Sequence, residues 1–196
     1  MIAASNLILV GPMGAGKTTI GRQLAEHLVM PFVDLDHEIE EHTGASIALI
    51  FEVEGEAAFR QREQHALQQA LERDGIVLAT GGGAILSADN RALLRQRGFV
   101  VWLDTPVSVQ LERLAREHHK RPLLQAPYRE QRLTDMAALR NPLYGETADI
   151  TIASTGRHPG GATIRNFLEQ ISSHWQRLPD STGCKHDDNS SSPRRA

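Results

Sequence analysis

Short apolar runs alternate along the chain with longer stretches in which apolar residues recur about every four positions. The short runs are residues 7–10, 32–35, 76–79, 99–103 and 150–152. Continuous apolar runs of this length are typical of strands buried on both faces of a parallel sheet. The first eleven residues, MIAASNLILVG, supply the first of these strands.

The longer stretches predict amphipathic helices. The recurring apolar positions are Ile20, Leu24 and Leu28 in one segment and Val107, Leu111 and Ala115 in another. The tripeptide Asp104-Thr105-Pro106 predicts a helix start with a capping side chain and a proline near the first turn. Alternating strands and helices predict a three-layer α/β domain with right-handed crossovers.

Length and composition favour one globular domain. A chain of 196 residues, 40% hydrophobic, can bury a core of its own. Apolar residues nearly vanish after residue 178, and such a segment cannot bury enough surface to offset its ordering entropy. We therefore expect a single domain over residues 1–178 and a disordered tail over residues 179–196.

Charge and cysteine content narrow the setting. A formal net charge of −3 argues against nucleic acid or an anionic membrane as the main partner. The one cysteine, Cys184, allows no intramolecular disulfide and lies in the predicted tail. The N-terminal run is too short to span a bilayer and lacks the basic start of a signal peptide, so we expect a cytoplasmic protein.

Residues 11–18, GPMGAGKT, match the pattern G-x-x-x-x-G-K-[ST] between a predicted strand and a predicted helix. Glycines allow successive N–H groups to face an anion, and the helix N-terminus adds partial positive charge. Lys17 is expected to reach the β- and γ-phosphates, and the Thr18 hydroxyl to bind Mg²⁺. The expected nucleotide-binding residues here are Gly14, Ala15, Gly16, Lys17, Thr18 and Thr19. The alternative is a glycine-rich turn with a chance lysine, which the full match in this setting disfavours.

A phosphate loop is shared by GTPase switches, motors and small-molecule kinases. The chain has little room for motor domains and contains no N-K-x-D sequence for reading guanine. The residues that follow the other predicted strands must therefore identify the phosphate acceptor.

Two aspartates, Asp34 and Asp36, stand at the end of the second predicted strand. Continued strand geometry places both carboxylates on one face, roughly 6–7 Å apart. One could orient the water shell of Mg²⁺, and the other could take the proton of an alcohol that attacks the γ-phosphate. The alternative is ordinary turn chemistry, in which aspartate is common.

Three glycines and several arginines complete the candidate site. Gly81, Gly82 and Gly83 follow a predicted strand, where they allow close approach and expose N–H groups, or form a flexible connection. Arginines are usually solvated, but beside a phosphate loop and an aspartate pair they could clamp a carboxylate or a transferring phosphate. The arginines concerned are Arg60, Arg121, Arg140 and Arg157.

Together these stretches resemble the shikimate kinase family over about residues 5–172. The resemblance is carried by GPMGAGKTTIGRQLA, FVDLDHEIE with HTG after it, EGEAAFRQRE, the triple glycine, KRPLL and RNPLY. It implies a nucleoside monophosphate kinase-like fold, with a five-stranded parallel sheet, flanking helices and a mobile lid. It also implies phosphorylation of the 3-hydroxyl of shikimate with ATP and Mg²⁺, on the route to chorismate and aromatic amino acids.

The resemblance also implies roles for individual residues. Asp36 contacts the shikimate hydroxyls close to the attacking one, Asp34 lies near the magnesium shell with Thr18, and Lys17 binds phosphate. The substrate carboxylate is held by Arg60 and Arg140, and the backbone at Gly82, within the substrate-binding stretch Gly81, Gly82 and Gly83, is the third substrate contact. Arg121, in the polar segment of about residues 118–129 that we take as the lid, reaches the ATP phosphates. Arg113 and Arg157 flank the nucleotide near the adenine.

Some positions depart from the family pattern. The stretch LERLAREHHKRPLL is one residue longer, so Arg116 is the alternative to Arg113, and GRHPGG also differs in length near Arg157. Thr18 replaces the commoner serine, and Thr80 stands where many phosphate-loop enzymes carry an acid.

Three rival functions remain at this point. Another small-molecule kinase of the same fold, such as gluconate kinase, would need the loop and lid but not the set of Asp36, Arg60, three glycines and Arg140. A nucleoside monophosphate kinase would need a base-reading feature. A nucleotide-dependent binding or regulatory module that has lost catalysis is disfavoured by the intact set of Lys17, Thr18, Asp36 and Arg121. We therefore expect shikimate and ATP as partners, with neither nucleic acid nor membrane, and a monomer.

Overall fold

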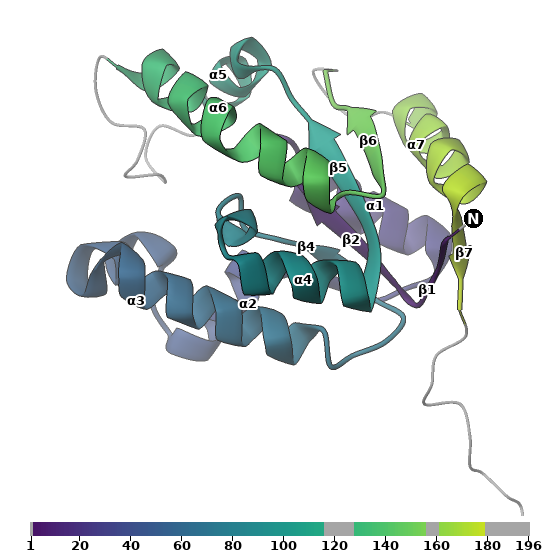
Figure 1. The fold of residues 1–196 in the computed structure, drawn as a ribbon, viewed down its shortest axis with the longest axis horizontal. Helices are drawn as coiled ribbons and strands as arrows, with labels where there is room; N and C mark the ends of the chain where they lie inside the picture. The colour runs from purple at the N-terminus through teal and green to yellow at the C-terminus, as the bar shows by residue number, and fades with distance from the viewer. Residues whose placement is uncertain (1, 116–127, 156–160, 179–196) are drawn as a thin grey trace, which may run out of the picture.

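The computed structural model of the protein describes residues 2–115, 128–155 and 161–178. Within them, a five-stranded sheet in the order β3-β4-β2-β5-β6 lies between two layers of helices (Figure 1). Its strands, all parallel, are β2 (Asn6–Val10), β3 (Phe32–Asp34), β4 (Val77–Ala79), β5 (Gly98–Asp104) and β6 (Ile150–Ala153). The five predicted strands and the three-layer α/β class are confirmed.

Each face of the sheet packs against its own set of helices. Leu7 and Leu9 of β2 belong to a core that includes residues of α1 (Lys17–Leu28) and α7 (Gly161–His174). Ile8 and Val10 point to the opposite core, because side chains alternate along a strand. The helices of this second core are α2 (Leu35–Thr43), α3 (Ile47–Ala70), α4 (Ala88–Arg97) and α6 (Arg129–Thr147). Burial on both faces explains why the strand sequences are continuously apolar.

The helix α5 (Val107–Leu114) corrects one detail of the sequence prediction. Its N-cap residue is Pro106, and no side chain caps the helix. Thr105 does not cap it, because its hydroxyl donates to the carbonyl oxygen of Leu103 at 3.4 Å. The buried residues of α5 are Gln110 and Leu114, whereas the expected Ala115 is exposed.

The N-terminal segment forms two strands rather than one. Ahead of β2, β1 (Ile2–Ala4) pairs in parallel with β7 (Trp175–Arg177), a strand that the apolar pattern did not predict. The Trp175 indole Nε1 donates to the Ala4 carbonyl oxygen at 2.9 Å, and the ring stacks on Phe99 with centroids 6.2 Å apart. This two-stranded sheet fastens the segment after α7 to the start of the chain.

Parallel strands bring their carboxyl ends to one edge of the sheet, where α/β proteins bind ligands. The phosphate loop follows β2, Asp34 ends β3, and Gly81 follows β4 after Thr80. The central position of β2 therefore places the loop between the residues that follow β4 and those that follow β5.

Two regions predicted from the sequence fall outside the described residues. They are residues 118–127 of the predicted lid, which connect α5 to α6, and the predicted tail, residues 179–196. Among the described residues, no helix combines the length and apolar character that crossing a bilayer requires.

Candidate active site

The phosphate loop is shaped by glycines in left-handed conformations. Gly14 has φ 76° and Gly16 has φ 87°, values that other residues adopt only with strain, and Gly16 is the N-cap of α1. The Lys17 ammonium donates to the carbonyl oxygens of Gly11 at 2.8 Å and Pro12 at 2.9 Å, so it lies across the loop. A loop of this geometry before a helix N-terminus is built to hold phosphate.

Arg113 on α5 contacts the phosphate loop at the Gly14 carbonyl. Its Nη1 donates to the Gly14 carbonyl oxygen at 2.7 Å, and its Nη2 donates to the Ser154 carbonyl oxygen at 3.0 Å. Burial lowers the pKa of this guanidinium. Arg113 therefore borders the nucleotide loop, whereas Arg116, Arg121 and Arg157 lie outside the described residues.

Asp34 and Asp36 do not continue one strand, which corrects the prediction from their spacing. The strand β3 ends at Asp34 and α2 begins at Leu35, because Leu35 and Ile39 bury one helical face. Asp34 is the N-cap of α2, and its carboxylate accepts from the Asp36 backbone N–H at 3.1 Å. The two side chains consequently have different neighbours.

Asp34 lies beside the phosphate loop. Its Oδ2 accepts a hydrogen bond of 2.6 Å from the Thr18 hydroxyl. A carboxylate and a hydroxyl are the oxygen ligands that suit Mg²⁺, which proteins commonly bind through one or two carboxylates together with substrate phosphates. No group of three or more His, Cys, Asp or Glu suited to a metal ion occurs in the parts of the chain that the structure describes. The oxygen atoms of Thr18 and Asp34 fit a magnesium site.

The triple glycine accommodates side chains from α2 and α3. A Cβ atom at Gly81 would lie 2.5 Å from Glu63 Oε1 and 2.8 Å from Asp36 Oδ1. A Cβ atom at Gly83 would collide with the guanidinium of Arg60. The prediction of close approach at these glycines is confirmed, and the approaching groups include Asp36 and Arg60.

Glu63 occupies the centre of this cluster, and the sequence analysis did not identify it. Its side chain is 1% exposed, and its Oε2 pairs with Arg60 Nη1 at 2.6 Å. Burial raises the pKa of Glu63, and the charge of Asp36 adds to this, outweighing the opposite effects of Arg60 and Arg140. Its Oε1 is buried without a hydrogen-bond partner among the described residues.

Arg60 is therefore held before any substrate arrives. Besides Glu63, its guanidinium contacts Glu56 Oε1, with Nη2 at 3.0 Å. Burial alone would lower the pKa of Arg60, but the charge and hydrogen bonds of Glu63 and Glu56 raise it above its ordinary value. A guanidinium fixed in this way presents its charge in a defined direction, which suits recognition of a carboxylate.

Arg140 and Tyr144 reach the same glycines from α6. Arg140 Nη1 donates to the Gly82 carbonyl oxygen at 3.2 Å, and the Tyr144 hydroxyl donates to the same oxygen at 2.7 Å. Arg60 and Arg140 thus meet at adjacent glycines, as a two-arginine clamp on a substrate carboxylate requires.

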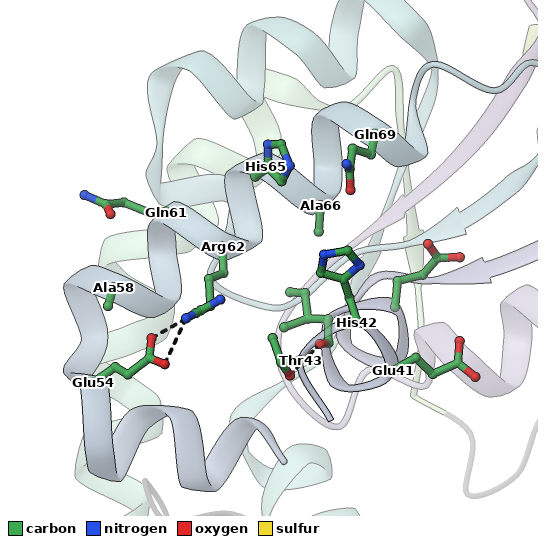
Figure 2. A pocket seen from close by; sticks show the side chains of 12 residues that line it. Glu41, His42, Thr43, Glu54, Ala58, Gln61, Arg62, His65, Ala66 and Gln69 are labelled. Atoms are coloured by element: carbon green, nitrogen blue, oxygen red, sulfur yellow. Dashed lines mark hydrogen bonds and ion pairs between the residues drawn. The ribbon is translucent and has the colours of Figure 1, made fainter. Parts of the chain in front are cut away.

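A separate hollow of about 710 Å³ lies between α2 and α3 (Figure 2). Arg62 crosses part of it and forms two hydrogen bonds of 2.9 Å with Glu54. Its lining contains none of the predicted site residues and includes the acids Glu38, Glu41 and Glu54. The lining also includes Arg62, which pairs with Glu54, and the hollow is distinct from the phosphate site.

The fold and this edge of the sheet define a class: a phosphate-loop kinase of the nucleoside monophosphate kinase-like kind, with a charged acceptor cluster beside the loop. The family model for shikimate kinase matches residues 13–174. The chain belongs to the shikimate kinase family, and it is accordingly an ATP-dependent kinase.

Relatives and solved structures agree with this assignment. A shikimate kinase from Stenotrophomonas maltophilia is 53% identical over 90% of this chain and 97% of the relative. One from Thioalkalivibrio sulfidiphilus is 47% identical over 99% of this chain and 98% of its own length. The structure of shikimate kinase from Acinetobacter baumannii in complex with shikimate has a TM-score of 0.80 and 52% identity, covering 87% of this chain and 94% of that one. The resemblance seen in the sequence motifs is confirmed.

Proposed function

We infer that the protein transfers the γ-phosphate of ATP to the 3-hydroxyl of shikimate, giving shikimate 3-phosphate and ADP in the biosynthesis of chorismate and aromatic amino acids. The observation that carries this inference is the meeting of Asp36, Arg60 and Arg140 at Gly81–Gly83, beside the phosphate loop. The similarity to a relative solved in complex with shikimate supports the same acceptor.

The nucleotide side of the site is formed by the phosphate loop. The N–H groups of Gly14, Ala15 and Gly16, together with the Lys17 ammonium and the hydroxyls of Thr18 and Thr19, bind the phosphates of ATP. On binding, Lys17 exchanges its contacts with the loop carbonyls for phosphate oxygens. Arg121 completes the charge around the transferring group from the lid, and Arg113 and Arg157 border the adenine.

Thr18 and Asp34 would hold a magnesium ion, which would supply positive charge to neutralise the β- and γ-phosphates. Their hydrogen bond of 2.6 Å supports this role, because it brings two oxygen ligands together beside the loop. Asp34 then faces the metal, while Asp36 faces the acceptor.

The acceptor side orients shikimate by its carboxylate. Arg60 and Arg140 grip the two carboxylate oxygens, and the backbone at Gly82 supplies a further contact. Asp36 aligns the 3-hydroxyl and takes its proton as the hydroxyl oxygen bonds to the γ-phosphorus. The bond from that phosphorus to the β-phosphate oxygen breaks, and ADP leaves with the electron pair.

We also propose that the protein acts as a monomer in the cytoplasm. The exposed large apolar residues of the described chain are distributed over separate elements, among them Ile2, Val29, Val53 and Leu139. One cysteine in the whole sequence agrees with a reducing compartment. Sedimentation of the purified protein at a mass of one chain checks the oligomeric state.

The acceptor assignment is tested by ADP release from the purified full chain. Shikimate, gluconate and nucleoside monophosphates are supplied in turn with ATP and Mg²⁺. Of these acceptors, we expect only shikimate to raise ADP formation well above the rate measured without an acceptor. A higher rate with gluconate or with a nucleotide acceptor would contradict the proposed function.

A further inference from the structure

Ser154 links the end of β6 to the phosphate loop and to α5. It directly follows β6 at the carboxyl edge of the sheet, and it is only 4% exposed. Its hydroxyl donates to the Ala15 carbonyl oxygen at 2.9 Å and accepts from Arg113 Nη1 and Nη2, both at 3.4 Å. Two consecutive loop carbonyls are therefore held from this side, that of Gly14 by Arg113 and that of Ala15 by Ser154.

The geometry of the peptide bond gives these contacts a consequence inside the loop. A trans peptide is planar, so its C=O and its N–H point in opposite directions. Holding the Gly14 carbonyl fixes the direction of the Ala15 N–H, and holding the Ala15 carbonyl fixes that of the Gly16 N–H. The Ala15 N–H closes a turn within the loop by donating to the Pro12 carbonyl oxygen at 3.3 Å. Both N–H groups belong to the set that the proposed function assigns to the phosphates of ATP.

We propose that Ser154 is a positioning residue for the nucleotide: it aims the Gly16 N–H at bound phosphate through the Ala15 carbonyl. This inference rests on the proposed function and extends its nucleotide side. Ser154 does not depend on Arg113 for this task, because its hydrogen bond to Ala15 does not pass through the guanidinium. The loop keeps this support when the guanidinium turns toward a nucleotide.

If the Ser154 hydroxyl only stabilised the fold, its removal would affect stability and nucleotide affinity differently. Its loss would lower the melting temperature and leave the affinity for nucleotide unchanged. A positioning role predicts weaker binding of ADP and ATP, with little effect on shikimate, whose site lies on the other side of the loop.

The test compares Ser154→Ala with wild type and with Ser172→Ala, a control that removes an exposed hydroxyl on α7. The dissociation constant of MgADP is measured by calorimetry, the two KM values by ADP release, and folding by thermal denaturation. We expect Ser154→Ala to weaken ADP binding and raise the KM for ATP about fivefold, the worth of one hydrogen bond. The KM for shikimate should stay within about twofold, and Ser172→Ala should match wild type.

Two further variants cover the case in which alanine impairs folding. Ser154→Thr keeps the hydroxyl and should restore ADP affinity to within about twofold of wild type, whereas Ser154→Cys, a weaker donor of similar size, should fall between serine and alanine. Unchanged ADP affinity in both Ser154→Ala and Ser154→Cys would overturn the proposal, and so would an equal rise in both KM values. ADP binding needs no acceptor, so a failure of the shikimate assignment would appear separately, as absent turnover in wild type.

Discussion

The carboxylates of Asp36 and Glu63 both lie against Gly81, but they differ in burial and in their contacts. Glu63 is almost completely buried and is committed to Arg60. Asp36 stands at the first turn of α2 and is partly exposed, where it can meet a substrate hydroxyl. The exposed acid is therefore suited to accept a proton, and the buried acid to hold an arginine.

Asp36→Asn tests the acid that we assign to the reacting hydroxyl. The amide keeps the size of the side chain and one acceptor oxygen but cannot take the proton, so kcat should fall about 100-fold or more. The measurement is ADP release at saturating ATP and shikimate. Asp89→Asn, which changes an exposed acid on α4, should leave kcat unchanged, and near-normal turnover of Asp36→Asn would remove its proposed role.

Glu63→Gln tests the buried acid through the pH dependence of stability. The raised pKa means that the folded protein binds this proton more readily than the unfolded chain. The contribution of Glu63 to stability is therefore fully present below the ordinary pKa of glutamate and is lost as pH rises through the raised folded-state pKa. Each pKa unit of difference between the folded and unfolded states is worth about 1.4 kcal/mol of stability.

We accordingly expect the free energy of unfolding of wild type, relative to Glu63→Gln, to fall as the pH rises from the ordinary pKa of glutamate, 4.5, into the alkaline range. Urea denaturation of both proteins across this range is the measurement. At pH 8 the variant should also show a KM for shikimate about tenfold higher, because Arg60 loses its charged partner. A stability difference that stays constant with pH would contradict the assignment of the raised pKa to Glu63.

At the scale of elements, two side chains of α6 share one hydrogen-bond acceptor in the loop after β4. Both Arg140 and Tyr144 donate to the Gly82 carbonyl, and the Tyr144 hydroxyl makes the shorter hydrogen bond. The ring of Tyr144 is fixed by stacking on Trp102 with centroids 5.7 Å apart. Because Tyr144 can satisfy the carbonyl alone, Arg140 is able to turn to a substrate carboxylate without leaving a buried acceptor unsatisfied.

Tyr144→Phe removes that hydroxyl and keeps the ring. The Gly82 carbonyl then depends on Arg140, which must give up this contact to bind substrate, so the KM for shikimate should rise about fivefold. The KM for ATP should not change, since the phosphate loop lies on the other side of the glycines. Kinetics with each substrate varied in turn separate the two, and a rise for ATP alone would show that α6 supports the nucleotide side instead.

The sequence predicted elements better than it predicted contacts. The five strands of the sheet were found because burial on both faces leaves a continuous apolar run, whereas β7 reads WQR, with only Trp175 buried, and gives no such run. The apolar segment of β1, IAA, was merged with β2 into one expected strand. The motif residues Asp36, Arg60 and Arg140 were found from known family patterns. Tyr144 and Ser154 were missed because each acts on a backbone oxygen far away in sequence, 62 residues in one case and 139 in the other.

Residue spacing gives a wrong prediction where the chain changes from strand to helix. The spacing of Asp34 and Asp36 suggests a strand, but the buried face of α2 draws Leu35 into a helix. Glu63 carried a usable signal, since it stands three residues after Arg60 on a helix, which is the spacing of an ion pair.

At the scale of the whole molecule, the two ends of the domain are joined by β1 and β7. Trp175 is 6% exposed, and its ring packs on Phe99 of the central sheet. This contact lies away from the phosphate loop and the acceptor cluster, so it should affect folding without affecting chemistry.

Trp175→Ala should lower the free energy of unfolding by about 3 kcal/mol, the usual loss for a large aromatic residue in a core. Its kcat and KM values should match wild type at a temperature where both are folded. Deletion of residues 179–196, the tail predicted to be disordered, is the matched comparison and should change neither quantity. A loss of stability on deleting the tail would contradict the predicted domain boundary.

Gly83 has φ −102° and ψ −9°, a backbone conformation open to any residue, so what excludes a side chain there is the guanidinium of Arg60. The residue at position 83 therefore constrains the residue at position 60 during evolution. An alanine at Gly83 would displace the Arg60 guanidinium from the position in which Glu56 and Glu63 hold it. We therefore expect residues 60 and 83 to change together among distant homologues, and to do so where the substrate has changed.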